Sequence, residues 1–173
     1  MKGGDPYVRA LMRTISASES NSDRPYSLLY GGQHFSNLSR HPEICVAIVV
    51  GPNKGNCSTA AGRYQIVNMT WYQLAPRYHP NPARFMFWSA YSFEPEYQDA
   101  VIYRWLNDTH VWGTDISQLL HQGKLNEVLR RLSPTWTSLG YGIETNSASR
   151  YLPQVYQKIL QEELKASGKT ETK

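Results

Sequence analysis

Glu19 carries a carboxyl group at a position where a predicted helix is expected to face the core. Asp5 followed by Pro6 is typical of a helix start, because Asp accepts unpaired amide hydrogens and Pro is tolerated at the first helical position. The apolar residues that follow have helical spacing and predict a buried stripe: Val8, Leu11, Met12 and Ile15. The next turn of this stripe reaches Glu19. Partial burial and the negative end of the helix dipole would both raise the pKa of its carboxyl group, which suits general acid catalysis at a glycosidic oxygen.

The simpler interpretation is a Glu at a frayed helix end. Its side chain would then turn to solvent or pair with Arg24 or Arg63, and the rarity of buried Glu favours this reading when position alone is considered. A hydrolase that uses water would need a second carboxylate at a defined separation from the acid. The candidates are Asp23, Glu43 and Asp99, of which Asp99 lies in a helix-like stretch, Q-D-A-V, and is expected to be structural.

A small and polar stretch, S-T-A-A-G, starts at Ser58 and Thr59. We expect it to open a second helix over residues 60–74, with an apolar side formed by Tyr64, Val67, Trp71 and Leu74. Small residues would let a ligand approach the backbone, and the amides of the helix start could donate hydrogen bonds to it. Close helix packing explains the same composition, and both interpretations stay open.

The two cysteines, Cys45 and Cys57, flank a turn-like stretch, G-P-N-K-G-N. A disulfide there would close a hairpin and contribute roughly 3 kcal/mol in the chain-entropy model. Two free thiols in a reducing compartment explain the spacing as well. No C-x-x-C or Cys/His ligand spacing is present, so we expect neither a zinc site nor any other cofactor.

The length of 173 residues fits a single domain with a core of its own, over residues 1–173. No apolar run approaches the roughly 20 residues that span a bilayer, so stable membrane insertion is not expected. The net charge of +4 would favour polyanionic partners, but the Lys and Arg residues are scattered, and we expect no nucleic-acid partner. The start, M-K-G-G-D-P, is not a signal peptide, so export would use another route or a signal already removed.

The first half of the chain carries the β-prone segments. Residues 26–35 contain two short runs about a Gly-Gly pair and predict a hairpin. The apolar run 44–50 predicts a strand or a short buried helix. The aromatic-rich connection 76–95 is expected to be functional or partly structured, either as a platform for sugar rings or as a flap over the core.

The second half predicts helices over 94–106, 115–121, 124–132 and 149–166, and a capped turn at 133–139. The last helix is expected to bury Tyr151, Val155, Ile159 and Leu164, and the polar residues after it, about 167–173, to be a disordered tail. The expected fold class is therefore α+β, mostly helical with a small antiparallel β element.

Several ordered motifs resemble one known family. They are the apolar helix ending in Glu19, G-G-x-x-F at Gly31–Phe35, His41-Pro42, S-T-A-A-G-R-Y-Q-I from Ser58, P-x-x-Q-D-A-V at Pro95–Val101, and W-x-S-L with G-Y-G at Trp136–Gly142. Together they resemble the phage lambda endolysin family of lytic transglycosylases, a branch of the lysozyme-like superfamily, and the likeness covers most of the chain. It implies a lysozyme-like fold.

The resemblance also implies cleavage of the β-1,4 bond between N-acetylmuramic acid and N-acetylglucosamine in peptidoglycan, with Glu19 as the catalytic carboxyl group. The acid would protonate the leaving oxygen, and its carboxylate would take the proton of the muramic O6 as O6 closes on C1. The product would be a 1,6-anhydro sugar. The residues expected to bind the glycan strand are Tyr30, Ser58, Thr59, Tyr64, Gln65 and Tyr141.

The alternatives to this function are a hydrolytic muramidase and a catalytically silent peptidoglycan-binding protein. In each case we expect a monomer that meets its substrate in the periplasm or the extracellular cell-wall space. The chain departs from the family at Ser18-Glu19-Ser20, where S-E-G is common, and Ser20 is expected to stiffen the turn after the acid. The segments 41–58 and 76–93 are longer than in the family, so the rim of the substrate-binding surface is expected to differ.

Overall fold

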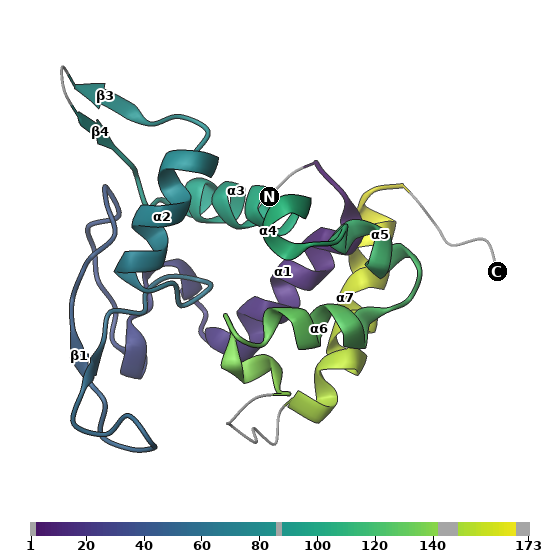
Figure 1. Ribbon diagram of the computed structural model, residues 1–173, viewed down its shortest axis with the longest axis horizontal. Helices are drawn as coiled ribbons and strands as arrows, with labels where there is room; N and C mark the ends of the chain where they lie inside the picture. The colour runs from purple at the N-terminus through teal and green to yellow at the C-terminus, as the bar shows by residue number, and fades with distance from the viewer. Residues whose placement is uncertain (1–2, 86–87, 142–148, 169–173) are drawn as a thin grey trace. The chain divides into compact units, whose positions relative to one another are not determined.

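The computed structural model describes residues 3–85, 88–141 and 149–168, and it is mostly helical (Figure 1). Its elements in chain order are α1 (Pro6–Glu19), the 3-10 turns η1 (Pro25–Ser27) and η2 (Tyr30–Gly32), β1 (Val46–Ala47), β2 (Cys57–Ser58), α2 (Asn68–Tyr78), β3 (Ala83–Phe85), β4 (Trp88–Ala90), α3 (Pro95–Leu106), α4 (Thr109–Trp112), α5 (Ile116–His121), α6 (Leu125–Leu132), η3 (Thr137–Leu139), η4 (Ser149–Tyr151) and α7 (Leu152–Ala166). Two antiparallel pairs, β1–β2 and β3–β4, complete it. The predicted α+β class is confirmed.

The contacts divide the chain into two compact units. The first unit contains α1 together with the chain from Tyr103 onward, and the second contains Ser20–Ile102. Helix α3 passes from one unit to the other between Ile102 and Tyr103. Each unit has its own buried apolar residues. The single domain expected over the whole chain stays a prediction.

Helix α1 has the predicted start, buried stripe and end. The amide of Tyr7 donates to Oδ1 of Asp5 at 3.0 Å, and the amide of Arg9 donates to the Asp5 carbonyl at 3.0 Å. The stripe is fully buried, with exposed fractions of 0–3% at Val8, Leu11, Met12 and Ile15. The helix ends at Glu19 and packs against α7, α5 and η3.

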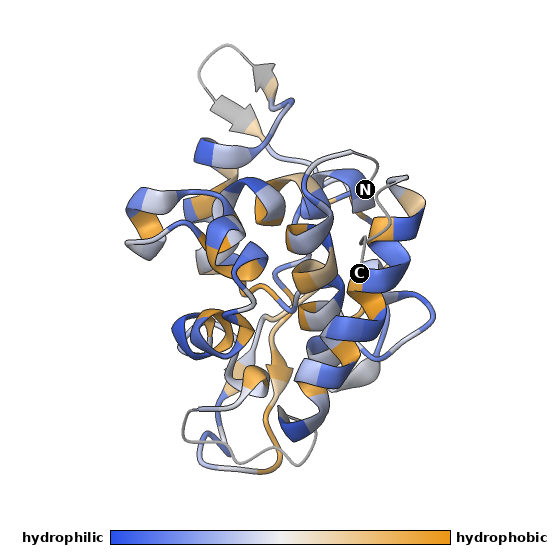
Figure 2. Cartoon of the chain, turned by 90° about the vertical axis from the view of Figure 1, so that its right-hand side faces the viewer, coloured by the Kyte–Doolittle hydropathy of each residue, from blue (hydrophilic) through white to orange (hydrophobic). Residues whose placement is uncertain are grey.

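Helices α5 and α6 also form where the sequence predicts them. Asp115 caps α5 by accepting from the amide of Gln118 at 2.9 Å, and Gly123, with φ of +73°, separates the two helices. In α6 the apolar residues face the core and the charged residues face outward, and Figure 2 shows such blue and orange stripes along the helices. The buried side chains of α6 are Leu125, Val128, Leu129 and Leu132.

The buried stripe of α7 differs from the predicted one. Tyr151 lies in η4 and is 53% exposed. The residues that face the core are Leu152, Tyr156, Leu160 and Leu164, so only Leu164 was placed correctly. These four recur every fourth residue and form one row along α7, whereas Tyr151, Val155 and Ile159 lie on the neighbouring row. Residues 169–173 of the expected tail lie outside the described residues.

The second predicted helix begins later than expected. Residues 60–67 form a tight turn in which Ala61 and Ile66 exchange backbone hydrogen bonds of 3.1 and 3.0 Å. Gly62 and Gln65 have positive φ, +75° and +46°, and a Cβ at Gly62 would lie 2.8 Å from the ring of Phe93. Only glycine fits there, so the helical spacing of the apolar residues was misleading, and α2 starts at Asn68.

Residues 26–35 return on themselves as predicted, but without two strands. The amide of Phe35 donates to the Ser27 carbonyl at 3.0 Å, and Leu28 and His34 form an isolated antiparallel bridge. The 3-10 turns η1 and η2 take up most of the segment. The strands β3 and β4 pair antiparallel, with Ala83 opposite Ala90, so the connection 76–95 is partly structured, as expected.

The apolar run 44–50 is a strand only at Val46 and Ala47, so the strand alternative is confirmed in part and the buried-helix alternative is wrong. Ile44, Val49 and Val50 are 45%, 69% and 72% exposed. The run belongs to a hairpin that β1–β2 pairing and a Cys45–Cys57 disulfide hold together, with a Cα–Cα distance of 5.4 Å. Because the cross-link and the ladder fix the backbone, these side chains need no core to order them.

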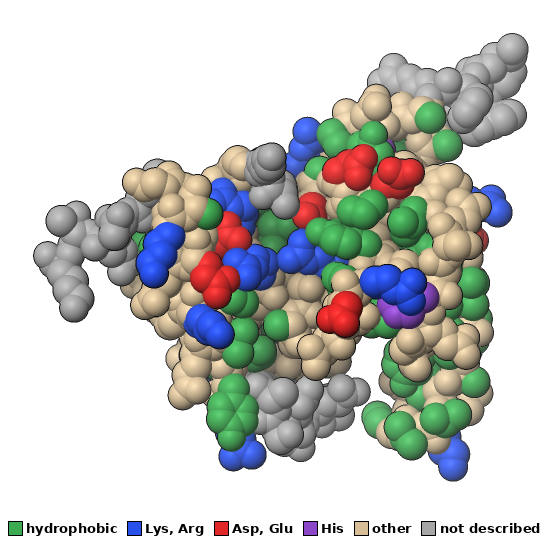
Figure 3. All heavy atoms as spheres, turned by 180° about the vertical axis from the view of Figure 1, so that it is seen from behind, with side chains coloured by type: hydrophobic (Ala, Val, Ile, Leu, Met, Phe, Trp, Pro, Cys, Tyr) green, Lys and Arg blue, Asp and Glu red, His purple; other side chains and the backbone are tan. Residues whose placement is uncertain are grey.

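Charged side chains of both signs share the surface. On the face shown in Figure 3, acidic side chains lie among the Lys and Arg side chains. Arg13 pairs with Glu162 at 2.6 Å, and Arg131 lies 3.8 Å from Glu127. The positive charge is therefore not gathered into one patch on this face. Among the described residues, no helix has both the length and the apolar character to cross a membrane.

Candidate active site

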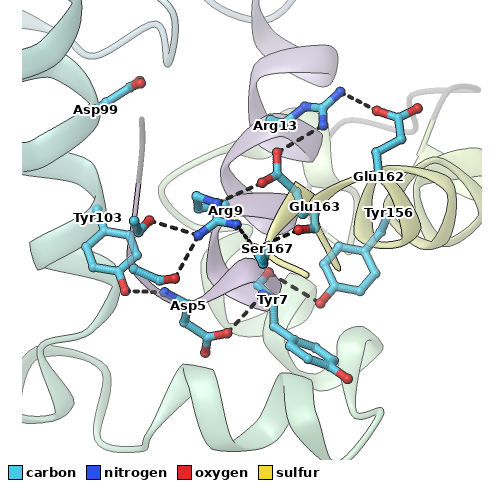
Figure 4. A network of polar contacts seen from close by, with 12 residues as sticks. Asp5, Tyr7, Arg9, Arg13, Asp99, Tyr103, Tyr156, Glu162, Glu163 and Ser167 are labelled. Atoms are coloured by element: carbon cyan, nitrogen blue, oxygen red, sulfur yellow. Dashed lines mark hydrogen bonds and ion pairs between the residues drawn. The ribbon is translucent and has the colours of Figure 1, made fainter. Parts of the chain in front are cut away.

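Helix α1, which carries Glu19, is fixed to α7 by a cluster of ion pairs and hydrogen bonds (Figure 4). Arg9 Nε lies 2.7 Å from Glu163 Oε2, and Arg13 Nη1 lies 3.0 Å from Glu163 Oε1. Arg9 also donates to the Gly3 and Gly4 carbonyls at 2.8 and 2.7 Å. Burial alone would raise the pKa of Glu163, but the two guanidinium groups outweigh it and lower that pKa below its ordinary value. These contacts fix α1 against α7.

Glu19 is half-buried at the C-terminal end of α1, and the last turn of this helix contains no basic residue. The negative end of the helix dipole is therefore not offset from within the helix. The hydroxyl of Ser138, in η3, donates to Glu19 Oε1 at 2.5 Å. Glu19 thus has the burial and the helix position that the sequence predicted. The raised pKa of its carboxyl group stays a prediction.

Ser138 is held in place by the residues around it. Trp136 and Leu139, on either side of it, are 2% and 1% exposed, and the Trp136 ring lies 5.4 Å from that of Trp105. The Leu139 amide donates to the Trp136 carbonyl at 3.0 Å. The sequence interpretation missed Ser138 as a site residue, although the W-x-S-L motif that contains it was recognised.

Tyr141 follows η3 in the same unit as Glu19. Its side chain is 52% exposed, its hydroxyl donates to Asn126 Oδ1 at 3.3 Å, and the Arg130 guanidinium lies 5.3 Å from its ring centre. The backbone of Tyr141 has φ of +68°. An exposed aromatic ring on a constrained backbone suits a sugar contact, which stays a prediction. The last residue of the G-Y-G motif, Gly142, lies outside the described residues.

Tyr30, Ser58 and Thr59 come together in the second unit. The Tyr30 amide donates to the Ala60 carbonyl at 2.9 Å, and Ser58 Oγ accepts from the Ala60 amide at 3.2 Å. Thr59 Oγ1 donates to Asn68 Oδ1 at 2.9 Å and accepts from the Asn68 amide at 3.2 Å. The prediction that S-T-A-A-G opens a helix is wrong, because α2 starts at Asn68 and Thr59 already satisfies its first amide.

Tyr64 lies inside the second unit and not on its surface. It is 1% exposed, and its hydroxyl donates to Asp99 Oδ1 at 2.7 Å. Burial and then the Asp99 charge raise the pKa of Tyr64 well above its ordinary value. The expected substrate contact is therefore replaced by the alternative role, a structural anchor. Gln65 is half-buried, and its side-chain amide donates to the Gly62 carbonyl at 3.0 Å, which stabilises the turn.

Asp99 organises this buried network. It is 3% exposed and accepts hydrogen bonds from Tyr26 Oη at 3.0 Å, from Tyr64 Oη, and from Arg63 Nη1 at 3.1 Å. Burial and the Asp99 charge raise the pKa of Tyr26. Gln98 adds a hydrogen bond from its Nε2 to the Phe93 carbonyl at 2.7 Å. Asp99 has the contacts of a structural residue, as expected.

The other two carboxylates, Asp23 and Glu43, are exposed. Glu43 accepts a short hydrogen bond from Tyr72 Oη, and burial together with this bond raises the pKa of Tyr72 to about 12. Ser20, just after the acid, is 3% exposed and donates to the Arg63 carbonyl at 2.7 Å, a contact that glycine could not make. The described residues contain no group of three His, Cys, Asp or Glu side chains that could hold a metal ion.

Comparisons with known proteins agree with this architecture. The model of the Endolysin family matches residues 9–162. An endolysin of Escherichia phage lambda is 25% identical over 132 residues, which are 75% of this chain and 72% of that protein. The solved structure of bacteriophage lambda lysozyme complexed with a chitohexasaccharide has a TM-score of 0.67 at 22% identity, covering 92% of this chain and 97% of that one. A second structure of lysozyme from bacteriophage lambda has a TM-score of 0.62 at 20% identity over 98% and 99% of the two chains, and both likenesses show a lysozyme-like fold.

Proposed function

The chain belongs to the endolysin family, whose members degrade peptidoglycan, and on that premise we propose that it is a lytic transglycosylase with Glu19 as its general acid and base. The observation that carries this proposal is the half-buried carboxyl group of Glu19 at the end of α1, which accepts a hydrogen bond from the Ser138 hydroxyl. Family membership supports peptidoglycan cleavage. The reaction type and the identity of the acid are the proposal.

The proposed reaction needs one carboxyl group. Glu19 gives its proton to the oxygen that joins the muramic acid C1 to the next sugar, and the C1–O bond breaks. The muramic O6 then bonds to C1, and the O6 proton passes to the Glu19 carboxylate, which restores the acid. A positioned O6 on the same ring has an effective concentration that water at C1 does not match. Atoms balance without water, and the product is 1,6-anhydro-muramic acid.

The other carboxylates support this choice. Asp99 is already engaged by two tyrosine hydroxyls and a guanidinium group, and Asp23 and Glu43 are exposed. A water-using muramidase would need one of them to activate water or to form a covalent intermediate. Asp99 is buried but already engaged, and Asp23 and Glu43 are exposed, so none of the three is both buried and poised for this role.

We propose peptidoglycan glycan strands as the binding partner, met in the periplasm or the cell-wall space. The similar phage lambda lysozyme has been solved with a chitohexasaccharide, a glycan of related chemistry. Tyr141 supplies an exposed ring, Ser58 and Thr59 supply hydroxyl groups, and the backbone of Tyr30 bonds to the neighbouring Ala60. Gln65 is proposed to bind glycan through the part of its side chain that remains accessible.

The experiment is digestion of purified peptidoglycan by the wild type, Glu19→Gln and Asp23→Asn. Glu19→Gln keeps the shape of the acid but cannot donate a useful proton, so we expect its turnover to fall by roughly a hundredfold or more while its melting temperature is unchanged. Asp23→Asn should match the wild type. Turnover near the wild-type rate in Glu19→Gln would reject the assignment. Saturable glycan binding without any product from the wild type would instead favour a silent binding protein.

A further inference from the structure

The oxygen atoms around Glu19 form a short hydrogen-bonded chain. Ser138 Oγ lies 2.5 Å from Glu19 Oε1 and 3.0 Å from Ser18 Oγ. Ser18 Oγ in turn lies 2.9 Å from the carbonyl oxygen of Ile15. These contacts connect the last turn of α1 with η3, which is 119 residues farther along the chain. All the groups belong to the first unit.

Counting hydrogens fixes the direction of the bonds. A hydroxyl has one hydrogen to donate, and a backbone carbonyl can only accept. Because Ser18 gives its hydrogen to the Ile15 carbonyl, Ser18 has none left to give to Ser138. The hydrogen of Ser138 therefore points either to Ser18 or to Glu19. When Glu19 is ionised, the carboxylate is the nearer and the charged acceptor, and it takes the hydrogen.

We propose that Ser138 is a positioning residue of the reaction, which donates a hydrogen bond to Oε1 of Glu19 and so stabilises the carboxylate that forms when the acid gives up its proton. This inference rests on the proposed function of Glu19. A hydrogen bond to an ionised acceptor is about twice as strong as one to a neutral acceptor, so the Ser138 bond strengthens as the proton leaves. Ser138 thereby favours proton transfer to the glycosidic oxygen. It also holds the carboxyl group in one rotamer, because its own position is fixed between the buried Trp136 and Leu139.

The test compares Ser138→Thr with Ser138→Val, two side chains of the same shape that differ only in the hydroxyl. Turnover of purified peptidoglycan and affinity for the chitohexasaccharide are measured for both, with Glu19→Gln in the same assay. Ser133→Ala is the matched control, since Ser133 is another buried serine of this unit and donates to the Arg130 carbonyl at 2.8 Å. Melting temperatures confirm that each variant is folded.

We expect Ser138→Thr to keep most of the turnover and Ser138→Val to lose roughly tenfold or more, as for loss of one hydrogen bond to a charged group. The chitohexasaccharide affinity of the two should be equal, because Ser138 acts on the acid and not on the sugar. Equal turnover of Thr and Val variants, with Glu19→Gln inactive, would overturn the role of Ser138 and leave the proposed function intact. An active Glu19→Gln would overturn both.

Discussion

Asp99→Asn is the substitution that separates a structural carboxylate from a catalytic one in this protein. Asp99 is 3% exposed and is the acceptor for Tyr26, Tyr64 and Arg63. Asn keeps one acceptor oxygen, but its NH2 group would point hydrogens at donors. The Arg63 side chain, only 16% exposed, would lose its counter-charge.

The magnitude follows from these contacts. Removing one partner of a buried ion pair costs about 3–5 kcal/mol, and we expect about 3 kcal/mol here because Arg63 keeps its bond to Tyr26 Oη. Tyr64→Phe removes a single hydrogen bond to the same carboxylate and should cost about 1.5–2 kcal/mol. Asp23→Asn, at an exposed acid, should change the free energy of unfolding by less than about 0.5 kcal/mol.

Urea unfolding measures the stability of all three variants. Glycan cleavage by Asp99→Asn is assayed at a temperature where this variant is folded. We expect cleavage per folded molecule to stay near that of the wild type. A loss of stability no larger than that of Asp23→Asn would refute the network argument. A folded and inactive Asp99→Asn would place Asp99 in the chemistry and contradict the mechanism with one carboxyl group.

Three further predictions concern the second unit. Burial lowers the pKa of His41 below its ordinary value, against a hydrogen bond to a backbone carbonyl and a nearby carboxylate, so the folded state holds the neutral ring. The neutral His41 ring therefore contributes to the stability of the folded state above the unfolded pKa of about 6.5, and this contribution is lost as the pH falls below that value. Urea midpoints that do not decrease between neutral and acid pH would contradict this pH dependence. Exported protein should show no free thiols under denaturing, non-reducing conditions, because Cys45 and Cys57 form a disulfide. Two titratable thiols in exported protein would contradict this disulfide. Val49→Ser, at a side chain 69% exposed, should change the free energy of unfolding by less than about 0.5 kcal/mol, and a loss of about 2 kcal/mol would show that Val49 is buried in solution.

Local signals predicted the elements whose structure is decided locally. The cap at Asp5 located the start of α1, and the apolar spacing after it predicted the buried stripe that leads to Glu19. The cap at Asp115 located the start of α5, and the break at Gly123 separated α5 from α6. Such elements need no information from the rest of the chain.

Long-range contacts decided the remainder. The turn at 60–67 depends on the approach of Phe93 to Gly62 and on the bridge between Leu29 and Ala61, neither of which periodicity can reveal. The exposure of the run 44–50 depends on a hairpin cross-link, since hydrophobicity alone predicts burial. The bond from Ser138 to Glu19 joins residues far apart in sequence, and only a recognised motif pointed toward η3.

The most direct test of the central claim is digestion of purified peptidoglycan in water enriched in heavy oxygen, followed by mass analysis of the fresh fragments. Transglycosylation takes no atom from solvent, so the released muropeptides should end in 1,6-anhydro-muramic acid, be lighter by one water than lysozyme products, and carry no heavy oxygen at C1. Reducing ends that each contain one heavy oxygen would show that water attacks C1. That result would contradict the mechanism with Glu19 as sole carboxyl group and make the protein a muramidase.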